Sequence, residues 1–303
     1  MNEFKLTYGY NGVPSSEDQH SKGLKVLSLC GGVETGLYAL HKLKIPISEY
    51  HTYEILPEAI AVSKYHFPFI TYHGDLYQAD FEQFRDVDLL LAGTSCQSLS
   101  RLRIDDKRIS NGLSGKSNIF YRAVEALHKI KPRYFMFENV IPASKDVLDE
   151  MSKSIGVDPI LIDSGRFSAQ NRERYYWTNI PLSNLPDESL LVLKDVMEDK
   201  VDEKYFYKKN FRITDMNKRV CGELLVNTTE MCRRIYNPNF KCSTLTCISG
   251  GYQEKKVLDQ GHPRKLTEIE YERLQGLPDR YTDVPINGKK MSYSKRCSLM
   301  GNG

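Results

Sequence analysis

The sequence lacks several features that define common protein classes. No apolar run approaches the roughly 18 residues that span a bilayer, and the start has no charged segment followed by an apolar one. There is no Cys-x-x-Cys pair and no Gly-x-Gly-x-x-Gly fingerprint, which argues against paired-cysteine zinc sites and dinucleotide-dependent oxidoreductases. We therefore expect no membrane association, and a reducing environment inside a cell.

The seven cysteines are an odd number, which suits free thiols better than a disulfide framework. Four of them fall in one segment, at Cys221, Cys232, Cys242 and Cys247. Zinc is conceivable there, although the usual two-residue ligand spacing is missing. Burial as small hydrophobic side chains is the better interpretation, and we expect no metal.

Charge is nearly balanced, with 42 Lys and Arg against 39 Asp and Glu, so the net charge of +3 permits nucleic-acid binding without arguing for it. Between positions 205 and 256, however, basic residues alternate with aromatic ones, a mixture that suits phosphate contact and base stacking. An ordinary solvated surface with packing aromatics explains the composition equally well.

Short apolar strands alternate with helical patterns from about residue 23 to residue 180, which indicates an α/β fold with a doubly wound, mostly parallel sheet. The segments at 159–163 and 174–178 are too close for a crossover helix, so we expect an antiparallel pair at the sheet edge. Residues 1–22 carry no sustained period and are predicted to be a flexible arm. A helix with Thr267 as its cap and Glu270 three residues later follows residue 265.

Three chemically active groups follow apolar runs. Cys96 comes after the run at 88–92, Glu138 ends the run at 134–137, and Arg172 and Arg174 enter a third strand. The carboxyl ends of parallel strands share one edge of a sheet. Thiol, carboxyl and guanidinium groups at that edge suit attack on an electron-poor ring, which favours a pyrimidine base.

The loop at residues 29–36 follows one strand and opens a helix, so its glycines would let a nucleotide-like ligand approach the backbone. Glu54 stands where a carboxylate can bind ribose hydroxyls, and Asp75 where an adenine amino group could donate. A plain tight turn, a helix cap or a surface acid is the alternative for each. The basic segment 98–117 nearly spells a phosphate-binding loop, but Ser110 replaces its first glycine, which argues against a triphosphate site.

Together these motifs resemble the DNA cytosine-5 methyltransferase family. The family's motifs occur here in their usual order along the chain. They are Leu29 to Gly36, Gly93-Thr94-Ser95-Cys96-Gln97, Glu138-Asn139-Val140, Gln170 to Arg174, and Arg273 to Pro278. The residues that fill these motifs look most similar to those of the de novo branch and of its compact bacterial or phage relatives. The resemblance implies a Rossmann-like S-adenosylmethionine-dependent methyltransferase with a small irregular target-recognition region, placed at 181–262. The catalytic domain would span 23–180, and 263–303 would return to it with an apparently shortened end.

The resemblance also implies roles for single residues. Cys96, Glu138, Arg172 and Arg174 would be catalytic. Binding of S-adenosylmethionine would involve Leu29, Gly31, Gly32, Thr35, Gly36, Glu54, Ile55, Asp75, Leu76, Gly93 and Asn302. Contact with DNA would involve Gln97, Ser98, Arg101, Arg103, Gln170, Thr244 and Thr246.

The implied reaction is methylation at C5 of cytosine in duplex DNA, after the base is flipped out of the helix. A tRNA cytosine-5 methyltransferase shares the same groups. A catalytically weakened DNA-binding protein is a further alternative, because Ser95 and Cys30 replace the family's proline and aromatic residue, and Leu277 its phenylalanine. Expected partners are duplex DNA, a cognate restriction nuclease, and a protein supplying the last helix. The expected location is the cytoplasm of a bacterium, or the nucleus of a eukaryote.

Overall fold

The computed structural model describes residues 23–302 except 95–117, 143 and 183. The described part of the chain forms two compact units. One unit holds residues 23–162 and 173–182, and the other holds residues 163–172 and 184–302. The boundary therefore passes through the motif from Gln170 to Arg174.

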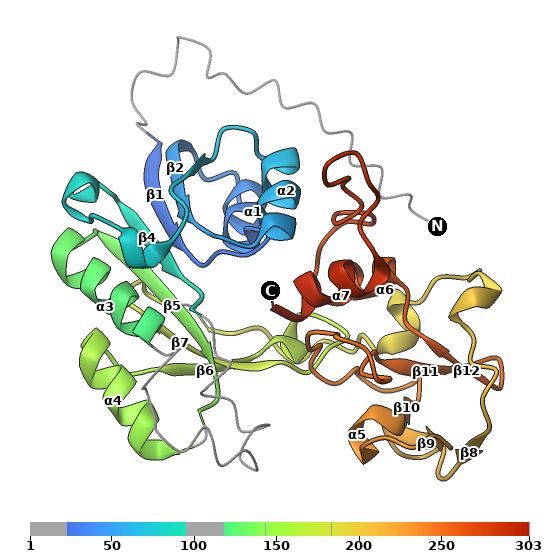
Figure 1. Ribbon diagram of the computed structural model, residues 1–303. Coiled ribbons are helices and arrows are strands. Elements are labelled where there is room, and N and C mark those ends of the chain that lie inside the picture. Colours follow the sequence, from blue (N-terminus) through green and yellow to red (C-terminus); the bar gives the residue numbers. More distant parts are fainter. Residues whose placement is uncertain (1–22, 95–117, 143, 183, 303) are drawn as a thin grey trace. The chain divides into compact units, whose positions relative to one another are not determined.

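The first unit is built on a seven-stranded sheet with the order β3-β2-β1-β4-β5-β7-β6 (Figure 1). Its strands are β1 (Leu24–Leu29), β2 (Ile47–Tyr53), β3 (Thr71–Tyr72), β4 (Leu89–Ala92), β5 (Tyr134–Val140), β6 (Ile160–Asp163) and β7 (Glu173–Thr178). Strands β1 to β5 pair in parallel, and β7 runs antiparallel to β5. The doubly wound, mostly parallel sheet that the sequence predicts is confirmed.

Helices cover both faces of this sheet. They are α1 (Thr35–Lys42), α2 (Pro57–His66), α3 (Asn118–Ile130) and α4 (Lys145–Ile155), with short 3-10 turns η1 (Leu76–Gln78) and η2 (Glu82–Phe84). Figure 1 shows α1 and α2 on one side of the strands and α3 and α4 on the other. Because successive strand residues face opposite sides, Leu27 and Leu90 enter one core and Val26 and Leu91 the other.

Helix α4 was not predicted from the sequence. Its cap, Ser144, accepts a hydrogen bond from the N–H of Val147, and Gly156 ends the helix in the left-handed region. A serine cap, a terminal glycine and an apolar face were all readable in the sequence. Helix α2 begins with Pro57, whose fixed φ and missing N–H suit the first turn of a helix.

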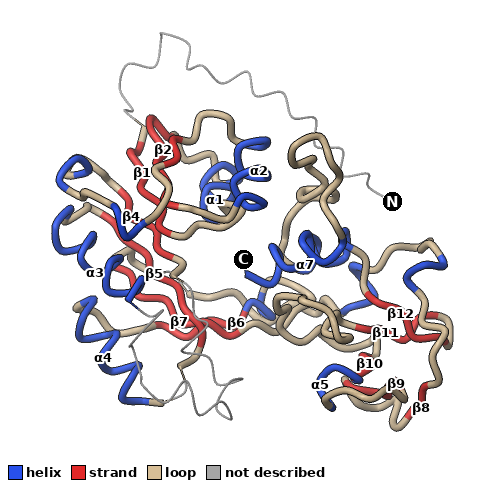
Figure 2. The backbone as a smooth tube through the Cα atoms, in the orientation of Figure 1, coloured by secondary structure: helices blue, strands red, loops and turns tan. Residues whose placement is uncertain are grey.

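The second unit contains a five-stranded sheet of order β12-β11-β10-β9-β8 (Figure 2). The strands are β8 (Phe211–Ile213), β9 (Val220–Leu224), β10 (Arg234–Tyr236), β11 (Lys256–Asp259) and β12 (His262–Lys265). The helices are α5 (Glu230–Arg233), α6 (Glu268–Leu274) and α7 (Tyr293–Asn302), and the 3-10 turns are η6 (Ser164–Arg166), η7 (Leu193–Val196) and η8 (Glu203–Tyr205). Strands of three to five residues are too short to establish a clear alternation. The region is therefore more regular than its sequence suggests.

Helix α6 begins with the predicted capping box. The Thr267 hydroxyl accepts from the N–H of Glu270 at 3.2 Å, and the Glu270 carboxylate accepts from the N–H of Thr267 at 2.8 Å. Helix α7 packs tightly nearby, since a Cβ at Gly301 would overlap the backbone of Thr246 and Cys247. None of the described helices combines the length and apolar character that crossing a bilayer requires.

Candidate active site

Parallel strands bring the predicted loops of the first unit to one edge of its sheet. Strands β1 and β4 end at Leu29 and Ala92, and the N–H of Gly93 donates to the Leu29 carbonyl at 3.0 Å. The N–H of Cys30 donates to the carbonyl of Tyr53, at the end of β2, at 2.9 Å. The loops that follow three strands are therefore fixed to one another by backbone hydrogen bonds at the edge where such folds bind ligands.

The glycine-rich loop between β1 and α1 has an unusual backbone. Cys30, Gly32 and Glu34 all adopt left-handed conformations, with φ of 58°, 59° and 58°. Nothing lies within 4 Å of the position that a Cβ on Gly32 would take, so one side of the loop is open. A Cβ on Gly36 would lie 2.9 Å from the Leu91 side chain, which means that glycine allows α1 to pack closely on β4. Thr35 is the first residue of α1.

Glu54 lies directly beside this loop. Its Oε2 accepts from the N–H of Gly32 at 2.9 Å, and its Oε1 accepts from the N–H groups of Ile55 and Leu56 at 2.8 Å each. The carboxylate is thus held in one orientation. The Ile55 side chain is 65% exposed, which is unusual for isoleucine. An anchored carboxylate next to an exposed apolar side chain suits a nucleoside, whose ribose is polar and whose base is flat and apolar.

Asp75 and Leu76 occupy the third loop of the predicted cofactor site. The Asp75 carboxylate caps η1 by accepting from the N–H of Tyr77 at 3.0 Å. The Leu76 side chain is only 2% exposed and belongs to the core of the sheet. Asp75 therefore has a structural partner already, and Leu76 is almost wholly buried.

A buried carboxylate beneath the loop was not predicted. Glu34 is 1% exposed, and it accepts hydrogen bonds from the hydroxyls of Ser28 at 2.9 Å, Tyr50 at 2.7 Å and Thr52 at 2.6 Å. Burial raises the pKa of this carboxyl, against the opposing effect of the three hydroxyl donors. The signal in the sequence was a charged residue inside a glycine-rich loop, followed by hydroxyl residues two apart on the next strand.

Glu138 and Arg174 meet on one face of the sheet. In the antiparallel register of β5 and β7, Glu138 pairs with Tyr176 and Val140 with Arg174, so Glu138 and Arg174 are diagonal neighbours. Their side chains form an ion pair with 2.9 Å between Nε and Oε1, and they are 32% and 12% exposed respectively. The pair is held by its register yet stays accessible to a substrate.

The predicted nucleophile lies outside the described residues. So do Gln97, Ser98, Arg101 and Arg103, which were expected to contact DNA. The last described residue before Cys96 is Thr94, which is held by Asn139, the neighbour of Glu138. The buried Asn139 amide donates to the Thr94 hydroxyl at 3.3 Å and to its carbonyl at 3.4 Å. The chain that enters the Cys96 segment is therefore fixed beside the acid-bearing strand.

Three predicted site residues lie in the second unit and make internal contacts there. Gln170 is fully buried, accepting from the N–H of Leu245 at 2.8 Å and donating to the Leu274 carbonyl at 3.1 Å. The Arg172 guanidinium donates to the Leu245 carbonyl at 3.4 Å. The Thr244 hydroxyl donates to the Asn171 carbonyl at 2.9 Å. These residues hold the 244–246 segment against the 170–172 segment.

The remaining predicted residues of this unit lie at its last helix. Asn302, in α7, accepts a hydrogen bond from the exposed thiol of Cys247, and Thr246 next to it is half-buried. Cys221 and Cys242 are fully buried. Within the described ranges, no group of three or more His, Cys, Asp or Glu side chains is arranged to hold a metal ion.

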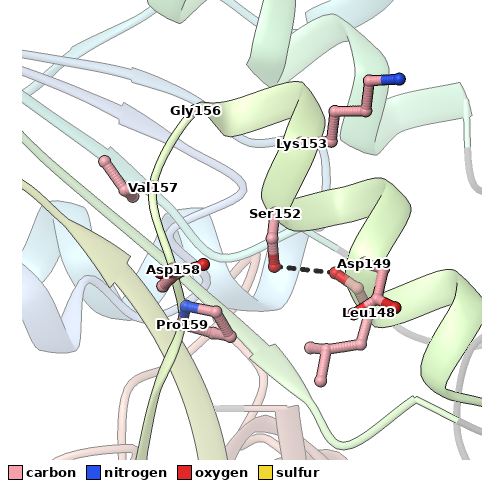
Figure 3. A pocket seen from close by; sticks show the side chains of 8 residues that line it. All are labelled: Leu148, Asp149, Ser152, Lys153, Gly156, Val157, Asp158 and Pro159. Atoms are coloured by element: carbon pink, nitrogen blue, oxygen red, sulfur yellow. Dashed lines mark hydrogen bonds between the residues drawn. The ribbon is translucent and has the colours of Figure 1, made fainter.

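The structure also shows a hollow of about 480 Å³ beside α4 (Figure 3). Its lining consists of Leu148, Asp149, Ser152, Lys153, Gly156, Val157, Asp158 and Pro159. The Ser152 hydroxyl donates to the Leu148 carbonyl at 2.8 Å within the helix. No predicted site residue lines this hollow, so the candidate active site rests on the strand-end loops.

With this geometry established, comparison with known proteins identifies the family. The family model for C-5 cytosine-specific DNA methylase matches residues 24–302. The chain belongs to this family. Its members use S-adenosylmethionine as the methyl donor.

Curated relatives of this DNA methylase come from bacteria and phages. The type II methyltransferase M1.ScrFI of Lactococcus lactis subsp. cremoris is 25% identical over 285 residues, which cover 85% of this chain and 69% of that protein. The orphan methyltransferase M.SPRI of Bacillus phage SPR is 26% identical over 257 residues, covering 67% and 56%. The chain thus matches between about half and two thirds of the length of these relatives.

Solved structures share the fold of this methylase at low identity. The Dnmt2 methyltransferase of S. pombe superposes with a TM-score of 0.64 at 18% identity, covering 92% of this chain and 94% of that one. The Entamoeba histolytica methyltransferase EhMeth gives a TM-score of 0.66 at 16% identity, covering 93% and 94%. These matches agree with a Rossmann-like methyltransferase fold.

The methylase also carries a thiol at Cys30, directly after the last residue of β1. Burial raises the pKa of the Cys30 thiol to about 12, and the carboxylates of Glu54, Glu34 and Asp75 add to the effect. Because the thiolate is the nucleophile, Cys30 stays unreactive at neutral pH.

We expect iodoacetamide at pH 7.5 to 9 to leave Cys30 unmodified in the folded protein while it alkylates the exposed Cys247. Peptide mass spectrometry after timed quenching measures both sites in one sample. Equal rates of modification at the two cysteines would contradict the assignment of Cys30 as an inert thiol.

Proposed function

We propose that this chain transfers a methyl group from S-adenosylmethionine to C5 of cytosine in duplex DNA, with Cys96 as the covalent nucleophile. The observation that carries the proposal is the ion pair of Glu138 and Arg174 at the end of β5, next to the Asn139 contact that fixes Thr94. Family membership supplies the reaction class. The residue roles are inferred from this arrangement.

The chemistry follows from the weak nucleophilicity of cytosine C5. The Cys96 thiolate adds to C6 and forms a C–S bond, while Glu138 holds a proton at N3, so the ring becomes an enamine with electron density at C5. Arg174 lies within reach of Glu138 and is proposed to hold the pyrimidine oxygen. Bound S-adenosylmethionine would supply the methyl group that C5 accepts, and S-adenosylhomocysteine would leave. Removal of the C5 proton by a base then expels the thiolate and restores the ring.

The residues of the first unit fit the methyl donor. The anchored Glu54 carboxylate suits the ribose hydroxyls, the exposed Ile55 suits the adenine face, and the open side of Gly32 admits the ligand to the backbone. We propose Leu29, Gly31, Thr35, Gly36, Asp75, Leu76, Gly93 and Asn302 as the further residues of this site.

The second unit is proposed to recognise the target. Base flipping is required because C5 and C6 are inaccessible within a stacked duplex. We assign DNA contact to Thr244 and Thr246 in this unit, and also to Gln97, Ser98, Arg101 and Arg103. Gln170, whose side chain is fully buried, is proposed to serve this contact by holding the segment. The buried hydrogen bonds of Gln170 and Thr244 support a role in holding the contacting segment, with Arg172 supporting it. The return of residues 263–303 to the catalytic domain remains part of this proposal.

The relatives suggest the biological setting. A type II methyltransferase and a phage orphan methyltransferase are among them, so we propose cytoplasmic action either beside a cognate restriction nuclease or alone.

Covalent trapping tests the proposed function. The protein is incubated with S-adenosylmethionine and duplex DNA containing 5-fluorocytosine, which cannot lose its C5 substituent as a proton. We expect a protein–DNA complex that survives denaturing electrophoresis, and we expect Cys96→Ala to abolish it. Cys232→Ala is the control, because it removes a partly accessible thiol outside the proposed site and should trap normally.

The other outcomes are informative as well. Labelled methyl groups on tRNA but never on duplex DNA would replace the proposed substrate with RNA. DNA binding without any covalent complex would identify a non-catalytic DNA-binding protein. Trapping by the Cys96→Ala protein would remove Cys96 from its proposed role.

A further inference from the structure

The Glu34 carboxylate is buried beneath the glycine-rich loop in a conformation that a non-glycine residue adopts only at a cost. Its φ of 58° and ψ of 50° lie in the left-handed region, where glycine is the residue without strain. Strained residues persist where surrounding contacts determine them, and they concentrate at functional sites. Because this backbone conformation disfavours glutamate, other interactions must account for its presence at position 34.

The contacts of Glu34 provide these interactions. Its two carboxylate oxygens accept from three hydroxyls, of Ser28 on β1 and of Tyr50 and Thr52 on β2. Its backbone N–H donates to the Gly31 carbonyl at 2.9 Å, which closes the loop into a turn. Glu34 therefore links strands β1 and β2 to the glycine-rich loop.

Gly31 shows that the carboxylate also fills space. A Cβ on Gly31 would overlap the carboxylate of Glu34 and the hydroxyl that Ser28 directs at it. Gly31 does not have a positive φ, so glycine is needed here for room and not for backbone freedom. The Glu34 side chain therefore occupies the space that a side chain at position 31 would need.

A second carboxylate also holds the loop. The Glu54 carboxylate, which accepts from the N–H of Gly32, is close enough to the Glu34 carboxylate for their charges to repel. The two residues hold the same peptide group, because Glu34 donates to the Gly31 carbonyl and Glu54 accepts from the Gly32 N–H. Gly32 is the residue with an open side, so its backbone is fixed in one shape before any ligand arrives.

We propose that Glu34 is a positioning residue for cofactor binding, which holds the backbone of the loop from Cys30 to Gly36 in its ligand-ready shape and requires glycine at position 31. The inference rests on the proposed binding of S-adenosylmethionine at this loop. Glu34 acts through the loop backbone and takes no part in the bond-forming steps.

The test compares Glu34→Gly, Glu34→Gln, Gly31→Ala and the double variant Gly31→Ala/Glu34→Gly. Steady-state methyl transfer gives kcat and the KM for S-adenosylmethionine, calorimetry gives its Kd, and thermal unfolding reports the fold. Glu82→Gln is the control, because it removes an exposed glutamate of η2 whose partner, Arg85, is also exposed. Glycine at position 34 adopts the left-handed backbone without strain, so Glu34→Gly removes the anchor while permitting the fold.

We expect Glu34→Gly to raise the KM and the Kd for S-adenosylmethionine about tenfold or more, because the loop is no longer held in one shape. At saturating cofactor, kcat should stay within about threefold, since the catalytic groups are untouched. Glu34→Gln should stay within about threefold in KM, because the amide keeps the shape and can bond the same hydroxyls. A purely structural role would lower the thermal midpoint without this division between KM and kcat.

The double variant tests the shared space. Gly31→Ala alone should raise KM more than about tenfold or fail to fold, because the methyl group meets a fixed carboxylate. In the Glu34→Gly background the same alanine should be tolerated, since Ser28 is then free to turn away. If Gly31→Ala does equal harm in both backgrounds, or if Glu34→Gly matches the wild type in KM, the inference is wrong. If the wild-type protein binds no S-adenosylmethionine, the proposed function itself fails.

Discussion

Replacing Glu138 with glutamine is expected to lower kcat about 100-fold to 10,000-fold, because the amide cannot hold a transferable proton at the ring nitrogen. The fold should be almost unaffected. The ion pair with Arg174 is partly exposed, and such pairs contribute roughly 0 to 1 kcal/mol to the free energy of unfolding. Methyl transfer to duplex DNA at saturating substrate, with thermal unfolding in parallel, measures both quantities.

Glu125→Gln is the matched control for this prediction. Glu125 lies on α3, its side chain is 35% exposed against 32% for Glu138, and it also pairs with an arginine, Arg122. The Glu125→Gln variant should lose no more than about threefold in kcat, because Glu125 belongs to an ion pair on the surface of helix α3. Glu138→Gln activity within threefold of the wild type would contradict the assigned role of the acid.

Replacing Arg264 with methionine is expected to lower the free energy of unfolding by about 3 to 5 kcal/mol. Arg264 is fully buried in β12 and forms ion pairs with Glu270 at 2.7 Å and with Asp259 at 2.6 Å. Methionine keeps most of the volume but leaves the buried Glu270 carboxylate without its cation. Urea unfolding followed by circular dichroism measures the loss.

An exposed ion pair in the same sheet provides the comparison. Arg212 on β8 pairs with Glu223, and its side chain is 65% exposed. Arg212→Met should change the free energy of unfolding by less than about 1 kcal/mol, because solvent screens the pair. Similar losses for the two methionine variants would show that burial does not determine how much these ion pairs contribute to the free energy of unfolding.

The sequence predicted the first unit well because its strands and helices carry strong local signals. The apolar runs at 88–92 and 134–137 form β4 and β5, as the pattern indicated. The meeting of Glu138 with Arg174 could also be anticipated from strand ends. Their diagonal placement depends on the register of β5 and β7, which only the folded chain shows.

Other features depend on contacts between distant residues and left weaker signals. The strands of the second sheet are too short to show a period. The Glu34 cluster combines residues from β1, the loop and β2, so no single window of sequence contains it. Gln170 belongs to a recognisable motif, but its burial depends on partners 75 and 104 residues away.

The mutual exclusion between positions 31 and 34 has an evolutionary consequence. Across related methylases, a bulky side chain at one of these two positions should be accompanied by glycine or alanine at the other. Such paired substitution would let one loop shape persist while the residues that build it are exchanged.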